Sequence, residues 1–181
     1  HYSKIALDAG IEAMKSLYTG AGYLDFKINN IDTSLSDDKK SIAVDIQISE
    51  GAQYKIGDIQ FTGDLLNQSI DDLRNLLIID KDDVFQRKKI VKSIQAITDV
   101  FADQGYAFAK INPITSEDKK NHTIALNINV DLNQKVYINR IVITGNTRTQ
   151  DEVIRREIGL SEGSLYSNSE LNESVNKIRR L

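Results

Sequence analysis

The sequence repeats itself with a period of about eighty residues, and this repeat limits the fold to a row of small, similar domains. The repeat is clearest in three segments whose apolar residues recur at the spacing i, i+4, i+7 and i+11, which is one face of an α-helix. These positions are Leu7, Ile11, Met14 and Tyr18 in the first segment, Ile90, Ile94, Ile97 and Phe101 in the second, and Leu171, Val175 and Ile178 in the third. Three matching helices favour an architectural role over a catalytic one.

Each of the first two helical segments is followed by the pattern of a β-hairpin. The dipeptide Gly-Tyr stands at 22–23 and 105–106, a polar turn at 36–40 and 116–120, and an alternating apolar run at 42–48 and 124–130. Apolar residues at every second position on both sides of a polar turn are typical of two antiparallel strands with one buried face. We therefore expect a hairpin after each of these helices.

A further strand and a short helix complete the repeat. The strand patterns cover residues 54–64 and 137–146, and both end in an apolar residue followed by Thr, Gly and Asp or Asn, which favours a sharp turn. The next helix in each copy has a hydroxyl residue three positions before an acid, the spacing of a helix N-cap. These pairs are Ser69 with Asp72 and Thr149 with Glu152. The predicted fold class is α+β, built from β-α-α-β-β units.

The repeat divides the chain into three parts. Residues 1–51 supply the second helix and hairpin of one unit, residues 52–134 make a complete unit, and residues 135–181 give the first strand and both helices of another. Units of this size lie near the lower limit of what one core can stabilise, because a domain of about 60 residues buries only about 60% of its unfolded surface. We expect the two partial units to be held less well than the middle one.

The composition excludes several classes of function. Lys and Arg number 23 and Asp and Glu number 26, with charges interspersed, which argues against a nucleic-acid partner that would require a basic face. No apolar run approaches the roughly 20 residues that span a bilayer. Cysteine is absent, and His1 and His122 have no His or Cys at a metal-ligand spacing. The sequence therefore predicts no metal, cofactor or catalytic site, and we expect that the protein is not an enzyme.

One predicted strand indicates where an extended peptide could bind. Pro113, the only proline, lies in the predicted strand 107–114, and proline has no N–H for a central ladder. That strand is expected at a sheet edge, where an extended foreign chain can add itself by main-chain hydrogen bonds. The equivalent strand of the first copy has no proline and is the better candidate for binding a peptide: Phe26, Lys27, Ile28, Asn29, Asn30, Ile31, Asp32, Thr33 and Ser34. The alternative is that Lys27 and Lys110 keep both edges charged and solvated.

The repeat resembles a known family. A strand-helix-helix-strand-strand unit with Gly-Tyr before the hairpin is similar to the polypeptide-transport-associated (POTRA) domain. Residues 136–157 carry Gly-Asn-Thr-Arg-Thr at 145–149 and Arg-Arg-Glu at 155–157, and they are similar to the start of the last POTRA domain in Omp85-family outer-membrane proteins. The resemblance implies tandem POTRA domains, each with a three-stranded mixed sheet packed on two helices. According to this resemblance, the chain would comprise most of a third POTRA domain, all of a fourth and the front of a fifth.

The resemblance also implies a function, partners and a location. The chain would be a periplasmic part of a Gram-negative outer-membrane protein, with no energy-consuming active site, and would contact the membrane only through a C-terminal β-barrel beyond its own residues. It would receive unfolded outer-membrane proteins by β-augmentation at residues 26–34. It would also dock accessory lipoproteins of the assembly complex, and the residues that match this docking surface are Arg155, Arg156 and Glu162.

Three alternatives stay open at the level of sequence. A POTRA scaffold of a related translocation module, a two-partner-secretion protein or a divisome protein would share the fold, although the tandem units and the motif of the last unit favour outer-membrane assembly. An enzyme with its chemistry at a domain interface would need a pocket with converging titratable groups. A passive structural spacer would bind no peptide at either sheet edge.

Overall fold

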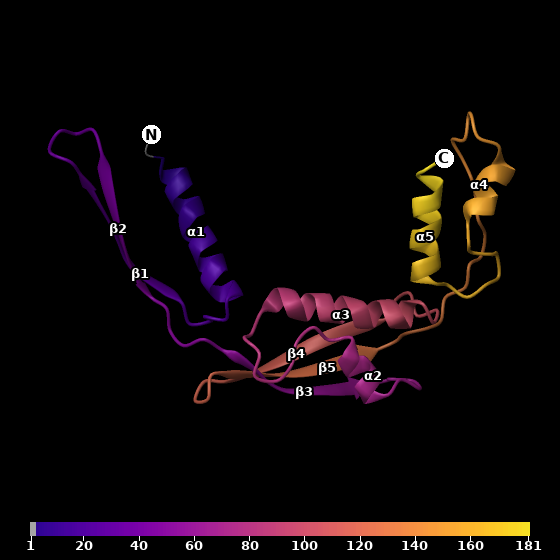
Figure 1. Cartoon of the computed structure of the whole chain (residues 1–181), viewed down its shortest axis with the longest axis horizontal. Coiled ribbons are helices and arrows are strands. Elements are labelled where there is room, and N and C mark those ends of the chain that lie inside the picture. The colour runs from indigo at the N-terminus through magenta and orange to yellow at the C-terminus, as the bar shows by residue number, and fades with distance from the viewer. Residues whose placement is uncertain (1–2) are drawn as a thin grey trace. The chain divides into compact units, whose positions relative to one another are not determined.

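The computed structural model describes residues 3–181, so the expectation for His1 lies outside the described residues. The elements, in chain order, are α1 (Lys4–Gly20), β1 (Lys27–Leu35), β2 (Ile42–Ser49), β3 (Lys55–Gly63), α2 (Ile70–Asn75), α3 (Arg87–Ala102), β4 (Lys110–Asp118), β5 (Thr123–Asp131), α4 (Asp151–Glu157) and α5 (Asn168–Ile178) (Figure 1). This mixture of helices and strands confirms the α+β class. No helix within residues 3–181 is long and apolar enough to cross a membrane.

The chain forms two compact units. One comprises the residues up to 59 together with 79–90 and 115–126, and the other comprises 60–78, 91–114 and 127–181. The first unit therefore contains α1, β1 and β2, and the second contains α2, α4 and α5. The residues of β3, α3, β4 and β5 are divided between the two.

In the first unit, β1 and β2 form the antiparallel hairpin that the alternation predicts. Lys27 is opposite Ser49 and Leu35 is opposite Ile42, with a register shift between Ile28 and Asn30. This shift is a β-bulge, which inserts one unpaired residue and so moves the inward-facing positions along by one. The bulge explains why Ile28 and Ile31, three residues apart rather than two, are the half-buried positions of β1.

The middle sheet has the strand order β3-β5-β4. Strand β4, which contains Pro113, therefore lies at an edge, and the prediction made from the proline is confirmed. Lys55 N–H donates to the His122 carbonyl and Asp64 N–H to the Val130 carbonyl, so β3 and β5 run in the same direction, and the sheet is mixed.

The central strand β5 supplies much of the core. Its inward residues are at most 4% exposed, and they are Ile124, Leu126, Ile128 and Val130. Burying one such side chain contributes about 1.5–3 kcal/mol relative to leaving it in water. Alternation along β5 is therefore one of the main stabilising features of the middle repeat.

Burial of the helical stripe differs between the repeats. Ile90, at the start of the stripe on α3, is 4% exposed, whereas the matching Leu171 on α5 is 38% exposed. None of the residues of α1 is buried. The repeats at the two ends of the chain thus bury less apolar surface than the middle one, in agreement with the expectation that they are held less well.

Two local predictions for the last repeat are wrong. Residues 137–146 form no strand, and their only bridge joins Tyr137 to Leu165, because no second strand lies beside them to complete a ladder. Thr149 does not cap α4, which begins after Gln150 without a side-chain cap, and the Thr149 carbonyl instead accepts a hydrogen bond from Asn146 Nδ2 at 3.1 Å. The matching cap of the middle repeat is confirmed, since Ser69 Oγ accepts from the Asp72 N–H at 3.0 Å.

The same main-chain hydrogen bonds form where each repeat meets the next, one across the boundary and one inside the following repeat. Tyr54 N–H donates to the Gly22 carbonyl at 2.8 Å, and Phe85 N–H donates to the Tyr54 carbonyl at 2.9 Å. The matching bonds of the next junction join Val136 to Gly105 at 2.8 Å and Tyr166 to Val136 at 2.9 Å. The glycine of each Gly-Tyr pair has a positive φ, +91° for Gly22 and +94° for Gly105, which favours glycine.

The glycine that ends β3 provides a test of this packing. Gly63 has φ +93°, and a Cβ there would lie 2.1 Å from the Val130 carbonyl oxygen, whereas the matching Gly145 has φ +80° and nothing within 4 Å. We expect Gly63→Ala to lower the free energy of unfolding by about 3 kcal/mol or more, because backbone strain and a clash add. Gly145→Ala should cost only about 1 kcal/mol, from strain alone. Urea unfolding followed by circular dichroism measures both, and equal losses would contradict the clash at Gly63.

Candidate functional site

The candidate peptide-binding strand has a neighbour on one side only. Among the described residues, the sheet that contains β1 has two strands, β1 and β2. A strand with one neighbour leaves every second N–H and C=O directed away from the ladder. Apart from Ile28 and Ile31, the residues of β1 are exposed. The geometry is thus compatible with an added strand.

The structure changes the predicted start of this strand. The range given by the sequence began at Phe26, but β1 begins at Lys27. The Phe26 ring instead stacks on the ring of Tyr18, with centroids 4.2 Å apart and planes at 10°. Tyr18 also donates its hydroxyl to Glu50 Oε1 at 2.9 Å, and this hydrogen bond raises the pKa of Tyr18. The end of α1 is thereby attached to the residues that flank both ends of the hairpin.

The bulge divides the edge of β1 into a short and a longer part. Asn29, the residue without a partner opposite it, donates its side-chain amide to Ser49 Oγ at 2.7 Å. From Asn30 to Leu35 the register with β2 is regular. A guest strand requires a regular row of donors and acceptors, so residues 30–35 form the longer usable part of the edge.

The turn of this hairpin is held by a carboxylate. Asp38 accepts hydrogen bonds from the Ser36 hydroxyl and the Lys40 N–H, and these bonds lower the pKa of Asp38. In the hairpin of the middle repeat, Asp118 accepts from Asn121 and its pKa is lowered in the same way. One acid of each predicted polar turn, Asp38 or Asp118, therefore organises that turn.

A buried tyrosine that the sequence analysis did not select lies between two repeats. Tyr54, 0% exposed, has its hydroxyl 2.8 Å from Glu117 Oε1 and 3.1 Å from Asp25 Oδ2. The hydrogen bond to Glu117, burial and the hydrogen bond to Asp25 raise the pKa of Tyr54, so the phenol keeps its proton. Its ring also meets that of His122 edge to face, 5.5 Å between centroids. The sequence signal was weak, because the matching position of the next repeat is Val136.

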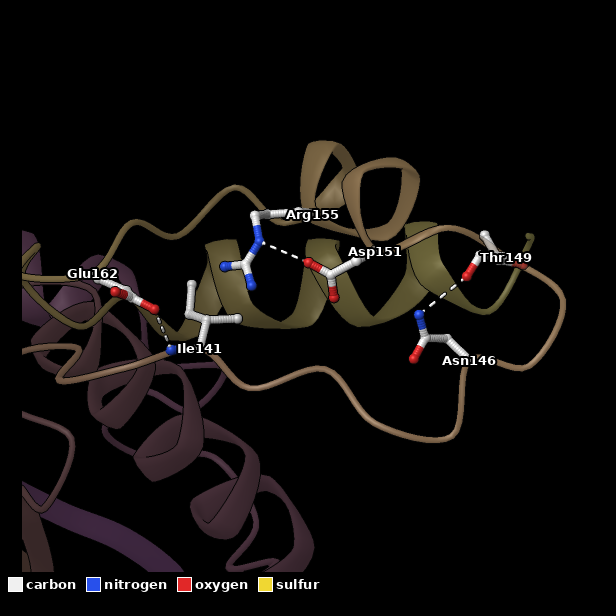
Figure 2. A network of polar contacts seen from close by, with 6 residues as sticks. All are labelled: Ile141, Asn146, Thr149, Asp151, Arg155 and Glu162. Atoms are coloured by element: carbon white, nitrogen blue, oxygen red, sulfur yellow. Dashed lines mark hydrogen bonds and ion pairs between the residues drawn. The ribbon is translucent and has the colours of Figure 1, made fainter.

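Two of the three candidate docking residues, Arg155 and Glu162, lie in separate contacts (Figure 2). Arg155 Nε donates to Asp151 Oδ2 at 3.3 Å, one turn earlier on α4. Glu162 Oε1 accepts from the Ile141 N–H at 2.8 Å, so this carboxylate holds the extended segment that precedes α4. Arg155, Arg156 and Glu162 are all exposed. Within residues 3–181, no hydrogen bond joins either arginine to Glu162, so these side chains form an open charged surface rather than a closed network.

An open groove lies within the first unit. It has a volume of about 380 Å³, and its lining comprises Gly57, Asp58, Lys81, Asp82, Ser116, Asp118, Asn121, Thr123 and Ala125. Lys81 Nζ lies 2.7 Å from Asp58 Oδ1 in an exposed ion pair, which lowers the pKa of Asp58. The lining contains neither histidine nor cysteine, the residues that most often serve as a general base or a nucleophilic thiol. Among the described residues no group of three His, Cys, Asp or Glu could hold a metal ion.

The lowered pKa of Asp38 predicts how the hairpin turn responds to pH. A carboxyl with a lowered folded pKa stabilises the folded state above its unfolded pKa, and this contribution is lost as the pH falls through the folded pKa. We expect the Lys40 amide shift to titrate below the ordinary Asp value of about 3.9, and Ser36→Ala to raise that midpoint. The matching titration of Asp118, followed at the Asn121 amide, should not change in the variant. A Lys40 midpoint at the ordinary value would contradict the hydrogen-bonded turn.

Comparisons with known proteins agree with the fold and with the repeat. The POTRA family model, described as surface antigen variable number repeat, matches residues 1–51, 54–132 and 136–181. The outer membrane protein assembly factor BamA of Buchnera aphidicola is 35% identical over 178 residues, which cover 98% of this chain and 28% of the relative. BamA of Nitratidesulfovibrio vulgaris is 32% identical over 165 residues, which cover 88% of this chain and 20% of the relative.

A solved structure gives the same result at the level of the fold. The crystal structure of Haemophilus influenzae BamA POTRA3-5 is 26% identical, with a TM-score of 0.72, and the match covers 96% of this chain and 68% of that chain. The chain thus spans only about a quarter of the length of the curated relatives it matches, 28% and 20%. Because the family matches extend over nearly the whole sequence, the chain belongs to the POTRA family.

Proposed function

We propose that the chain is part of the periplasmic POTRA arm of an outer-membrane protein assembly factor, and that it receives unfolded outer-membrane proteins and docks accessory lipoproteins. The proposal is supported by relatives whose names give outer membrane protein assembly as their role. It locates the chain in the periplasm of a Gram-negative bacterium. Neither task requires a catalytic group, so the protein would not act as an enzyme.

The single observation that carries the proposal is the open edge of β1. An unfolded outer-membrane protein arrives as an extended chain with unpaired N–H and C=O groups. Pairing these groups with β1 reads the main chain rather than the side chains, and one edge can therefore accept many different sequences. The edge is short, since the regular part covers residues 30–35, which favours weak binding and release.

The comparison of β1 with β4 favours β1 as the peptide-binding edge. The two strands share the pattern Lys-Ile-Asn-x-Ile, at 27–31 and 110–114, and the variable position is Asn30 in β1 and Pro113 in β4. A proline removes one donor from an edge and so hinders the addition of another strand. On this comparison β4 is protected, and β1 retains a complete set of donors.

The proposed lipoprotein surface rests on α4 and the loop that follows it. Arg155 and Arg156 place two positive charges on one short helix, and both are exposed. Glu162 adds a negative charge, but it is already engaged with the Ile141 N–H. A partner with an acidic patch would be attracted chiefly by the arginines, because complementary charge increases the rate of association.

A proline copied from β4 into β1 tests the peptide-binding edge. We expect Asn30→Pro to weaken binding of an unfolded outer-membrane β-strand peptide by about tenfold or more, because one ladder donor is lost and its partner is left unpaired. Backbone NMR titration of the 181-residue chain measures the affinity and locates the shifted amides. In the parent chain, these shifts should be confined to β1 and its neighbours.

Two matched variants complete this experiment. Asn30→Ala keeps the N–H and should bind like the parent chain, although its side chain no longer donates to Asp32. Pro113→Asn gives β4 the residue found in β1 and should leave the β1 shifts unchanged. Undiminished binding by Asn30→Pro would contradict strand addition at this edge, and an absence of shifts in the parent chain would favour the passive spacer.

Charge reversal on α4 tests the docking surface. We expect Arg156→Glu to weaken binding of the accessory lipoprotein by about tenfold, because a favourable charge becomes a repulsive one. Surface plasmon resonance at several salt concentrations measures the affinity and its dependence on charge. Lys177→Glu on α5 is the control for net charge, and an equal loss in both variants would mean that the effect comes from overall charge rather than from α4.

A further inference from the structure

The junction between the second and third repeats has a side-chain contact in addition to its main-chain hydrogen bonds. Asp103, directly after α3, accepts hydrogen bonds from the Ser167 hydroxyl at 3.2 Å and from the Ser169 N–H at 2.7 Å. The Ser169 hydroxyl also donates to Asp103. All of these residues belong to the second unit. One carboxylate from the end of α3 therefore binds the N-terminus of α5.

The contact provides a hydrogen-bond acceptor for a backbone N–H at the start of α5. The first N–H groups of a helix have no partner inside it, and a negative charge near them is favourable. Ser167 caps α5 locally by accepting from the Glu170 N–H at 3.3 Å. Asp103 takes the Ser169 N–H, so α5 is capped twice, once by its own repeat and once by the repeat before it. A helix of 11 residues is marginal in isolation, and a second cap therefore matters for its stability.

A second carboxylate of α3 takes part. Asn168 Nδ2 donates to Asp99 Oδ1 at 3.2 Å, and Gln95 Nε2 donates to the same oxygen at 2.9 Å. Asp103 is exposed, and its partial desolvation raises its pKa, but the hydrogen bonds from Ser169 and Ser167 outweigh this effect, and the pKa lies below its ordinary value. Asp103 is thus held in the ionised form that accepts several donors.

The first junction lacks this contact. Two residues before the Gly-Tyr pair, the first repeat has Gly20 where the second has Asp103, so this position of the first repeat carries no carboxylate. The residues that match Ser167 and Ser169 are Gln86 and Lys88 at the start of α3. The acceptor and its serine donors thus occur together at the second junction and are absent together at the first, which indicates a specific contact rather than an incidental one.

We propose that Asp103 is a positioning residue that fixes α5 of the third repeat to α3 of the second, so that the two helices move and unfold together. The first junction, which depends on main-chain bonds and on Tyr54, is not fixed in this way. The inference concerns the mechanics of the arm and does not require that β1 binds a peptide. It assigns to one carboxylate a role that neither the fold nor the family likeness specifies.

Residual dipolar couplings of the 181-residue chain test the proposal, because they report the relative orientation and motion of two helices. In the parent chain, the amides of α3 and α5 should fit one alignment tensor. In Asp103→Ala they should require two tensors, and hydrogen exchange of the α5 amides should become about tenfold faster while that of β5 is unchanged. Asp103→Asn keeps an acceptor without the charge and should give an intermediate result.

Three further variants separate positioning from general destabilisation. Asp118→Asn removes another carboxylate with a lowered pKa, but one whose hydrogen bonds stay inside a single turn, and it should leave the common tensor intact. Ser169→Ala removes one donor and should reproduce part of the Asp103→Ala effect, even if the latter variant folds poorly. The double variant Asp103→Ala, Ser169→Ala should be no worse than Asp103→Ala alone. One common tensor and unchanged exchange in both Asp103→Ala and Ser169→Ala would overturn the proposal.

Discussion

The structure depends on one main-chain hydrogen bond between successive repeats. In it, the turn after a helix accepts a hydrogen bond from the first residue of the extended segment that opens the next repeat. At the first junction, the Tyr54 N–H donates to the Gly22 carbonyl, and the Phe85 N–H donates to the Tyr54 carbonyl, so the three residues form a short row. Such a row requires a close approach of two backbones, and a Cβ at Gly22 would lie 3.1 Å from the Tyr54 carbonyl oxygen. The Gly-Tyr pair, which the sequence revealed as a repeated mark, is therefore the point at which one repeat is attached to the next.

Features that depend on residues close together in the chain could be predicted from the sequence. Periodicity gave the class of fold, the hairpins and the edge position of β4, because each depends on residues that are close in the chain. It failed at residues 137–146, whose apolar alternation is that of β3 but which have no strand beside them. It also failed at Thr149, where an amide side chain from Asn146 binds the carbonyl and no cap forms. Propensity describes one segment, whereas a strand or a cap needs a second partner.

The candidate sites were predictable to different degrees. The edge of β1 followed from the comparison with Pro113, since a missing donor is a property of one residue, but the bulge at Asn29 depends on register and became visible only in the structure. The docking residues came from the family resemblance, and Ile141, which engages Glu162, could not be foreseen from it. Tyr54 and Asp103 were missed because their partners are distant in sequence and differ from one junction to the next.

The two junctions share their main-chain bonds but differ in their side chains, and this difference has a mechanical consequence. Main-chain bonds between repeats depend little on sequence, so they can be kept while side chains change. A buried phenol shared by two carboxylates at Tyr54 is one hydrogen-bonding arrangement, and an ionised carboxylate with several donors at Asp103 is another. Both arrangements place hydrogen-bond donors on a carboxylate, and such charge-assisted hydrogen bonds are the stronger class. Substitution of a few side chains can therefore change how firmly one junction is held, without any change in the fold of the repeats themselves.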